Sequence, residues 1–324
     1  MNRRDTLLVL LALGTGPLVG RAQPVERVRR IGFLSGGQSS SPTWQQLRDA
    51  LRRLGWENGR NLVIEGRYAE SKAERLPALA RELLELKVEL IVASLNPSIA
   101  AAKSVTTTIP IVMLVGASPV EVGYVKTLAR PGGNITGTVW TGPESAGRIL
   151  RLLKDAKPGA VRIATLCNPA FPIAQAWRNE SDRAAKLLGL SVQYFDVTRA
   201  EELSPALERI AAAKPDALVA WGDQINILHG AEIAAFAIER RLAFASNSPR
   251  HTEAGGLLSF APDLVALNER TASFVDRILR GAAPSELPVE EPTKFDLVVN
   301  ARTAAAIGHK IPAAVLLQAT RVIE

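Results

Sequence analysis

Short apolar runs alternate with longer amphipathic runs along almost the whole of this chain of 324 residues. A near-continuous apolar run such as 88–94 is typical of a strand that is covered on both faces of a parallel sheet. A run with apolar residues at helical spacing, such as 73–86, predicts a helix that covers such a sheet. Because strands and helices alternate in this way, the chain is predicted to be an α/β protein built from βαβ units.

The alternation runs through the chain twice. In the first run we expect strands at 28–34, 61–68, 88–94, 109–115 and 134–140, and helices at 43–54, 73–86, 97–105 and 120–129. In the second run we expect strands at 161–167, 191–196, 216–221, 242–246, 256–260 and 295–300, and helices at 144–155, 172–188, 200–213, 228–240, 264–279 and 301–307. Two runs of similar length predict two Rossmann-like lobes with parallel sheets, at roughly 100–200 residues each.

The first 22 residues have the layout of a secretory signal peptide. Arg3 and Arg4 precede an apolar stretch of about 14 residues, which is shorter than the roughly 20 that span a bilayer. Gly20 and Ala22 place small residues at the two recognition positions of a cleavage site. The arginine pair also resembles a twin-arginine signal. We therefore expect the mature protein to lie in the periplasm.

The charge and the cysteine content of the chain narrow the range of possible functions further. The net charge is +7, but the basic residues are scattered singly or in pairs, whereas nucleic-acid binders concentrate them in a patch. We therefore expect no nucleic-acid partner. The single cysteine, Cys167, can form neither an intramolecular disulfide nor a cysteine-rich metal site.

No catalytic motif is present in the sequence. The chain contains no Gly-x-Ser-x-Gly elbow, no phosphate-binding loop and no His-Glu-x-x-His helix. Its three histidines, His229, His251 and His309, lack the spacing of metal ligands. We expect no catalytic residue, no metal and no cofactor. An exported hydrolase or isomerase and a ligand-presenting sensory module remain the alternatives to a transport protein.

Candidate binding residues follow the predicted strands, because ligands of doubly wound sheets bind outside the carboxyl ends of the strands. In the first run, the residues in these positions are Ser35, Gly37, Gln38, Ser94, Asn96, Ser118 and Trp140. Glycine lets the backbone approach a ligand, and hydroxyls before a helix suit a carboxylate. Ser94, Asn96 and Ser118 are equally suited to cap the segments that follow them, and Ser41 is suited to cap the helix after the first strand.

In the second run, the corresponding positions hold Asn168, Phe171, Asp223 and Asn247. A carboxylate at Asp223 could accept hydrogen bonds from a ligand ammonium group, or it could cap the segment that follows. The rings of Trp140 and Phe171 could stack on a planar ligand, although aromatic residues also serve as ordinary core.

Several strings in the sequence are distinctive, among them 130–137 (RPGGNITG), 106–112 (TTTIPIV), 287–295 (LPVEEPTKF) and the terminal 321–324 (RVIE). With them the chain resembles, over about residues 28–324, the ABC transporter substrate-binding family that includes tryptophan- and tyrosine-binding members. The resemblance implies a type I periplasmic binding protein fold, in which three crossovers join two lobes that close on the ligand.

The resemblance also implies boundaries and partners. It places the crossovers near 137–142, 259–262 and 291–294. Lobe 1 would comprise 28–138 plus 261–292, and lobe 2 would comprise 139–260 plus 293–324. The expected function is that of a periplasmic solute-binding protein, a monomer that captures an amino acid or an aromatic or other organic acid. Its protein partner would be the membrane permease of an ABC importer.

Two positions depart from the pattern of this family. Many relatives have Asp-Pro-Val where this chain has Ser118-Pro119-Val120, and many have an aromatic residue where this chain has Ser246. The first change removes a carboxylate and the second removes a ring, so the expected ligand class is kept broad.

Overall fold

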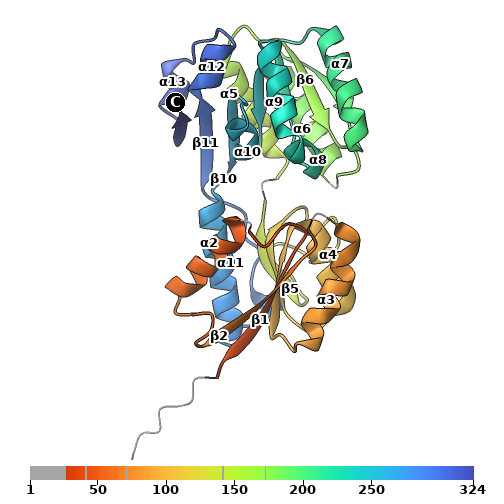
Figure 1. The fold of residues 1–324 in the computed structure, drawn as a ribbon, viewed down its shortest axis with the longest axis vertical. Coiled ribbons are helices and arrows are strands. Elements are labelled where there is room, and N and C mark those ends of the chain that lie inside the picture. Colours follow the sequence, from red (N-terminus) through yellow and green to blue (C-terminus); the bar gives the residue numbers. More distant parts are fainter. Residues whose placement is uncertain (1–26, 41, 71, 141, 172) are drawn as a thin grey trace, which may run out of the picture.

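The chain forms two α/β lobes, each built around its own sheet (Figure 1). The computed structural model describes residues 27–324 except 41, 71, 141 and 172, so the predicted signal peptide lies outside the described residues. The N-terminal lobe holds a five-stranded sheet in the order β2-β1-β3-β4-β5, and the C-terminal lobe holds a seven-stranded sheet in the order β12-β11-β10-β9-β8-β6-β7. Within the described part of the chain, no helix is long and apolar enough to cross a membrane.

The elements of the N-terminal lobe follow the predicted alternation closely. Its strands are β1 (Arg29–Ser35), β2 (Leu62–Tyr68), β3 (Leu90–Ser94), β4 (Ile111–Gly116) and β5 (Ile135–Val139). Its helices are α2 (Pro42–Arg53), the 3₁₀ turn η1 (Ala73–Arg75), α3 (Leu76–Glu85) and α4 (Leu95–Val105). The later α11 (Leu264–Leu279) and η3 (Pro284–Glu286) return to this lobe, where α11 packs on α2, β4 and β5.

The C-terminal lobe contains the remaining elements. Its strands are β6 (Arg162–Cys167), β7 (Ser191–Asp196), β8 (Ala217–Ala220), β9 (Ala243–Ser246), β10 (Leu258–Pro262), β11 (Phe295–Asn300) and β12 (Arg321–Ile323). Its helices are α5 (Glu144–Ala156), α6 (Ala174–Leu188), η2 (Ala200–Glu202), α7 (Leu203–Ala213), α8 (Gln224–Leu228), α9 (Gly230–Glu239), α10 (Pro249–Glu253), α12 (Ala301–Ala306) and α13 (Ala313–Leu316).

Helices cover both faces of each sheet, which is why the central strands are apolar throughout. In the N-terminal lobe, α2 and α11 bury Leu47, Leu51 and Phe274 on one face, and α3 and α4 bury Leu83 and Ile99 on the other. In the C-terminal lobe, one core lies under α5 and α6 and the other lies under α7 and α9. Each lobe therefore has its own hydrophobic core.

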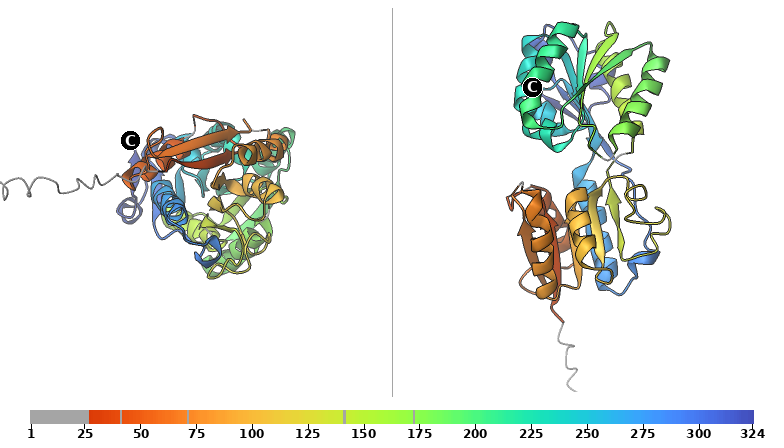
Figure 2. Two further views of the ribbon diagram at one scale, coloured as in Figure 1. Left: turned by 90° about the horizontal axis from the view of Figure 1, so that it is seen from below. Right: turned by 90° about the vertical axis from the view of Figure 1, so that its right-hand side faces the viewer.

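The strand directions bring the carboxyl ends of both sheets to the junction of the lobes. In the N-terminal lobe, β5 is parallel to β4, β3 and β1, and after Val139 the chain passes into the C-terminal lobe. In the C-terminal lobe, β10 is parallel to β9, β8 and β6, and after Pro262 the chain passes back to α11. A third passage, at 291–294, leads to β11. Figure 2 shows the two lobes and the junction from the side.

One predicted helix is wrong. Residues 120–129 form turns and bends instead of a helix, because Tyr124 and Val125 both donate their backbone N–H to Pro119 O and Gly123 adopts φ 72°. The predicted parallel arrangement holds for most strand pairs of both sheets, and in the second sheet β10 and β11 run antiparallel. This reversal follows from the third passage, which enters the C-terminal lobe beside the strand that leaves it.

Candidate functional site

The candidate site comprises the loops that follow β1, β3, β4 and β5 in one lobe and β6, β8 and β9 in the other. Ten of the eleven residues predicted to bind a ligand lie in these loops or at the strand ends that precede them, and Asn96 lies in the first turn of α4, directly after β3. Because the carboxyl ends of both sheets lie at the junction of the lobes, the loops converge on it from opposite sides (Figure 1). Whether each residue binds a ligand stays a prediction.

The loop after β1 is shaped by its own polar groups. Ser35 Oγ accepts a hydrogen bond from Gly37 N at 3.1 Å, and Gly37 O accepts one from Glu70 N at 3.1 Å. Gly37 and Gln38 are exposed, which leaves their surfaces accessible to a ligand. Beneath the loop, Trp44 packs against Phe33 with ring centroids 4.5 Å apart and belongs to the core of the lobe.

Asn96 joins the loops after β3 and β4. Its Nδ2 donates to Ala117 O at 2.9 Å, and its Oδ1 accepts from Ala117 N at 2.8 Å. This pair of bonds fixes the distance between the two loops. Ser94 occupies the N-cap position of α4, but its side chain makes no capping hydrogen bond. The predicted capping role is therefore absent at Ser94, and its hydroxyl is not committed to the helix.

Three of the seven described non-glycine residues with positive φ lie at the ends of β3 and β4. Leu95, Val115 and Ser118 have φ values of 63°, 64° and 46°, a region that side chains other than glycine rarely adopt. The pairing of β4 with β5 is also irregular between Met113 and Gly116, which is typical of a β-bulge near a functional site. Strain of this kind is a recognised mark of ligand sites.

Leu95 and Val115 were not among the predicted residues. Leu95 stands at the end of β3 with 55% of its surface exposed, although leucine normally lies in a core. Its exposure at this edge makes it a candidate contact for an apolar part of a ligand. The sequence carries no signal for it, because the left-handed conformation depends on the loop and not on the residue type.

Trp140 and Phe171 lie at the edges of their lobes. Trp140 is half-buried against the core of the N-terminal lobe, and its backbone N–H donates to Gly116 O at 2.8 Å. Phe171 is half-buried and stacks on Trp177, with ring centroids 5.3 Å apart, and Trp177 stacks on Trp221 at 5.4 Å. Phe171 is therefore the outer member of a column of three rings that leads into the core.

Asp223 caps α8 and directs its carboxylate inward. Oδ1 accepts from Ile225 N at 2.8 Å and from Asn226 N at 3.1 Å, and Oδ2 accepts from Asn226 Nδ2 at 2.7 Å. Burial raises the pKa of this carboxyl group to about 6, although the backbone hydrogen bonds act in the opposite direction. The structure thus shows the capping role, and pairing with a ligand cation stays a prediction.

The other two polar residues of the C-terminal lobe also hold loop backbone. Asn168 Oδ1 accepts from Ala170 N at 3.0 Å, which forms a tight turn before Phe171. Asn247 Oδ1 accepts from Gly222 N at 2.6 Å and so connects the loops after β9 and β8. Ser246 is fully buried and bonds to His251 Nδ1 at 2.6 Å. His251 also gave no signal in the sequence.

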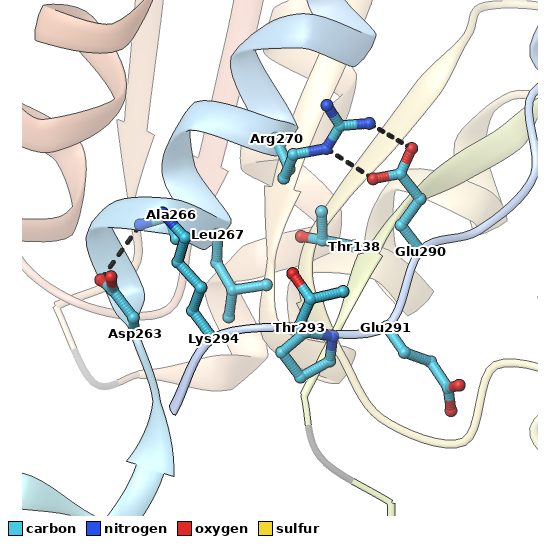
Figure 3. A pocket seen from close by; sticks show the side chains of 10 residues that line it. Thr138, Asp263, Ala266, Leu267, Arg270, Glu290, Glu291, Thr293 and Lys294 are labelled. Atoms are coloured by element: carbon cyan, nitrogen blue, oxygen red, sulfur yellow. Dashed lines mark hydrogen bonds and ion pairs between the residues drawn. The ribbon is translucent and has the colours of Figure 1, made fainter. Parts of the chain in front are cut away.

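A cavity of about 310 Å³ lies between α11 and the third passage (Figure 3). Its charged lining residues are Asp263, Arg270, Glu290, Glu291 and Lys294, and none of the eleven predicted residues lines it. Figure 3 shows Arg270 and Glu290 joined by two hydrogen bonds, at 2.6 and 2.5 Å. This cavity belongs to the junction of the lobes. Among the described residues, no group of histidine, cysteine or acidic side chains could hold a metal ion.

Comparisons with known proteins agree with this architecture. A tyrosine-binding protein of Clostridioides difficile (strain R20291) is 25% identical over 258 residues, which are 80% of this chain and 74% of that protein. A conserved domain protein from Vibrio cholerae superposes with a TM-score of 0.83 at 26% identity and covers 91% of this chain and 100% of its own.

A solved complex with L-Trp from Streptococcus pneumonia has the same fold. Its TM-score is 0.83 at 24% identity, with 91% of this chain and 99% of that chain covered. The predicted fold class, two α/β lobes of the type I periplasmic binding protein kind, is thus confirmed. The family described as ABC transporter substrate binding protein matches residues 31–323. The chain therefore belongs to the family of ABC transporter substrate-binding proteins, as the motifs of its sequence predict.

Proposed function

We propose that this protein captures a small organic molecule between its two lobes and delivers it to the membrane permease of an ABC importer. The observation that supports this most directly is the strand direction, which turns the carboxyl-end loops of both sheets toward the junction of the lobes. A ligand that contacts both sets of loops favours the closed arrangement, which a permease can distinguish from the open one.

The ligand we propose is an amino acid or an aromatic or other small organic acid. A relative is named for binding tyrosine, and a neighbour of the same fold was solved with L-Trp. The exposed Leu95 and Phe171, the outer ring of its column, suit an apolar group, and the loops around Ser35 and Ser94 suit a carboxylate. Ser118 supplies no carboxylate that could pair with a ligand ammonium group. Organic acids that lack an ammonium group therefore stay in the proposed ligand class.

We propose that the protein binds its ligand without altering it. Ser246 and His251 form a hydrogen bond that resembles a nucleophile paired with its base, but both residues are 0% exposed. A substrate cannot reach a hydroxyl in that position. We further propose that the N-terminal signal directs export and is cleaved after Ala22, so that the mature protein begins at Gln23. The mature protein then acts as a monomer in the periplasm and delivers its ligand to a permease.

Isothermal titration of the purified protein with L-tyrosine, L-tryptophan, benzoate and phenylacetate tests the ligand class. We expect saturable binding of at least one of these compounds, accompanied by a smaller radius of gyration in X-ray scattering as the lobes close. Native mass spectrometry of the protein isolated from its own periplasm extends the test to ligands outside this set.

A control separates specific capture from surface adsorption. The D-enantiomers of the two amino acids carry the same groups in the wrong arrangement, and we expect them to bind more weakly. Chemical conversion of a bound compound, or saturation of the protein without any change in its radius of gyration, would contradict the proposal.

A further inference from the structure

Two neighbouring loops of the C-terminal lobe carry predicted ligand residues. The β8 loop, residues 221–226, contains Asp223, and the β9 loop, residues 246–248, contains Asn247. Their strands β8 and β9 are paired in parallel, so the loops emerge side by side at the junction of the lobes. Their relative position therefore decides where this lobe presents its groups to a ligand.

One direct bond connects the two loops. Asn247 Oδ1 accepts from Gly222 N at 2.6 Å. The approach is close enough that a Cβ atom at Gly222 would lie 2.8 Å from that oxygen. A single bond between two short loops fixes one distance but not their mutual orientation, so a second connection is needed to define it.

His251 on α10 supplies the second connection. One ring nitrogen, Nε2, lies 2.7 Å from the backbone oxygen of Asn226 in the β8 loop. The other, Nδ1, lies 2.6 Å from Ser246 Oγ in the β9 loop. Because a carbonyl oxygen only accepts hydrogen bonds, Nε2 carries the proton, and Nδ1 is left to accept a bond from the serine hydroxyl. Ser246 Oγ in turn accepts from Ser248 N at 3.1 Å.

We propose that His251 is a positioning residue that, in its neutral Nε2–H form, holds the β8 and β9 loops in the arrangement that binds the ligand. This inference rests on the proposed function, since it assigns a role within the same site. His251 does not touch the ligand, because it is 0% exposed beneath both loops.

The connection depends on the charge state of the ring. A proton on Nδ1 would place a charge in a fully buried site and would leave the Ser246 hydroxyl hydrogen without its acceptor. Burial accordingly lowers the pKa of His251. Among the described residues, the ionisable groups on the elements around it form no bond to the ring. They are Asp223 before α8, His229, Glu232 and Glu239 at α9, Arg250 and Glu253 on α10, Asp296 on β11, and Arg321 on β12.

Hydrogen exchange tests the proposal without any ligand. In His251→Ala we expect the amides of Gly222 and Ser248 to exchange at least about tenfold faster, while amides of β4 in the other lobe keep their rates. His251→Gln can still donate to Asn226 O and accept from Ser246 Oγ, so it should restore slow exchange. His229→Gln changes a half-buried histidine of the same lobe, whose side chain bonds to Glu232 instead of to either loop, and is the matched control. Equal exchange of the two amides in His251→Ala and in the unmodified protein would overturn the inference.

Affinity for L-tyrosine, measured at about pH 7.5 and about pH 4.5, tests the charge dependence. We expect the unmodified protein and His229→Gln to lose at least about fivefold more affinity at the lower pH than His251→Gln, whose side chain does not titrate. An equal loss in all three proteins would assign the pH effect to Asp223 or to another group and would refute the charge dependence of the connection through His251. If no variant binds L-tyrosine at either pH, the proposed ligand fails, while hydrogen exchange still decides on His251.

Discussion

Single polar residues at the strand ends could be located from the sequence but not oriented. Parallel strands bring their carboxyl ends to one edge, so Asn96, Asn168, Asp223 and Asn247 were expected there. In the structure each of them bonds to the backbone of a loop, because short amide and carboxylate side chains compete for nearby N–H groups. The direction of such a side chain depends on the loop conformation, and His251 is buried by tertiary packing that its neighbours in the sequence do not reveal.

Replacing Asp223 separates its capping role from its predicted binding role. Asp223→Ala removes the N-cap of α8 and should lower the free energy of unfolding by about 1–2 kcal/mol in urea titrations. Asp223→Ser keeps a capping oxygen and should recover most of this loss. If the carboxylate also pairs with a buried ligand cation, both variants bind L-tyrosine about 2–5 kcal/mol more weakly. An unchanged affinity in Asp223→Ser would show that the residue only caps the helix.

The two buried ionisable groups should affect stability in opposite directions. The pKa of Asp223 is about 6 in the fold against an ordinary value of 3.8, so its contribution is present at low pH and is lost as the pH rises through this range. The difference between these two pKa values limits the contribution of Asp223 to the free energy of unfolding to about 3 kcal/mol. The pKa of His251 is lowered, so the unfolded chain binds that proton first and stability falls as the pH drops below 6.5.

The two pH dependences can be separated by measuring the unfolding free energies of the single variants from about pH 4 to about pH 7. Relative to Asp223→Ser, the unmodified protein should gain stability as the pH falls. Relative to His251→Gln, it should lose stability. Parallel pH profiles in all three proteins would refute both assignments.

Most helices and strands could be predicted because they are long and periodic, but the end of β4 could not. The predicted helix at 120–129 is replaced by turns, and the strand before it is distorted by Val115 at φ 64°. A β-branched residue gives no sequence signal for such a conformation. The distortion depends instead on the neighbouring strand, where Gly137 has φ 128° and lies directly against Met113.

Gly137 is therefore expected to be essential for this part of the sheet. A Cβ atom there would lie 2.4 Å from Met113 O and 2.5 Å from Met113 N. Gly137→Ala should lower the free energy of unfolding by about 3 kcal/mol or more, because backbone and not a flexible side chain blocks the new atom. Gly133→Ala is the control, since its Cβ would meet nothing within 4 Å. Equal unfolding midpoints for the two variants would contradict the close approach.

At the scale of the whole molecule, two lobes follow from the two runs of alternating elements, but the construction of their junction does not. Glu290 is central to it. Its N–H donates to Gly137 O and its carbonyl accepts from Val139 N, both at 3.0 Å, while its carboxylate bonds to Arg270. Thr138 also bonds to Thr271 of α11 at 3.0 Å. These contacts join residues far apart in sequence, so no local pattern could predict them.

These contacts join β5, which leads into the first passage between the lobes, to the start of the third passage and to α11. All of them lie on the N-terminal side of the junction. We therefore expect the lobes to bend beyond them, at 140 and 142–143, at 262–263 and at 291–294. Arg270→Gln releases the carboxylate of Glu290 and gives the third passage freedom that closure must remove again. We expect affinity for L-tyrosine to fall about three- to fivefold, or about 1 kcal/mol, without any change in the residues that face the ligand.

The matched control for this variant is Arg53→Gln, which breaks the ion pair between Arg53 on α2 and Glu269 on α11 and leaves the bonds between Arg270 and Glu290 in place. The two arginine side chains are exposed to a similar degree, so a general loss of positive surface charge would affect the two variants alike. X-ray scattering of the ligand-free proteins should show a broader distribution of lobe separations only for Arg270→Gln. Equal affinities and equal scattering in the two variants would mean that closure is governed by the loops alone, and that the ion pair at the junction has no part in it.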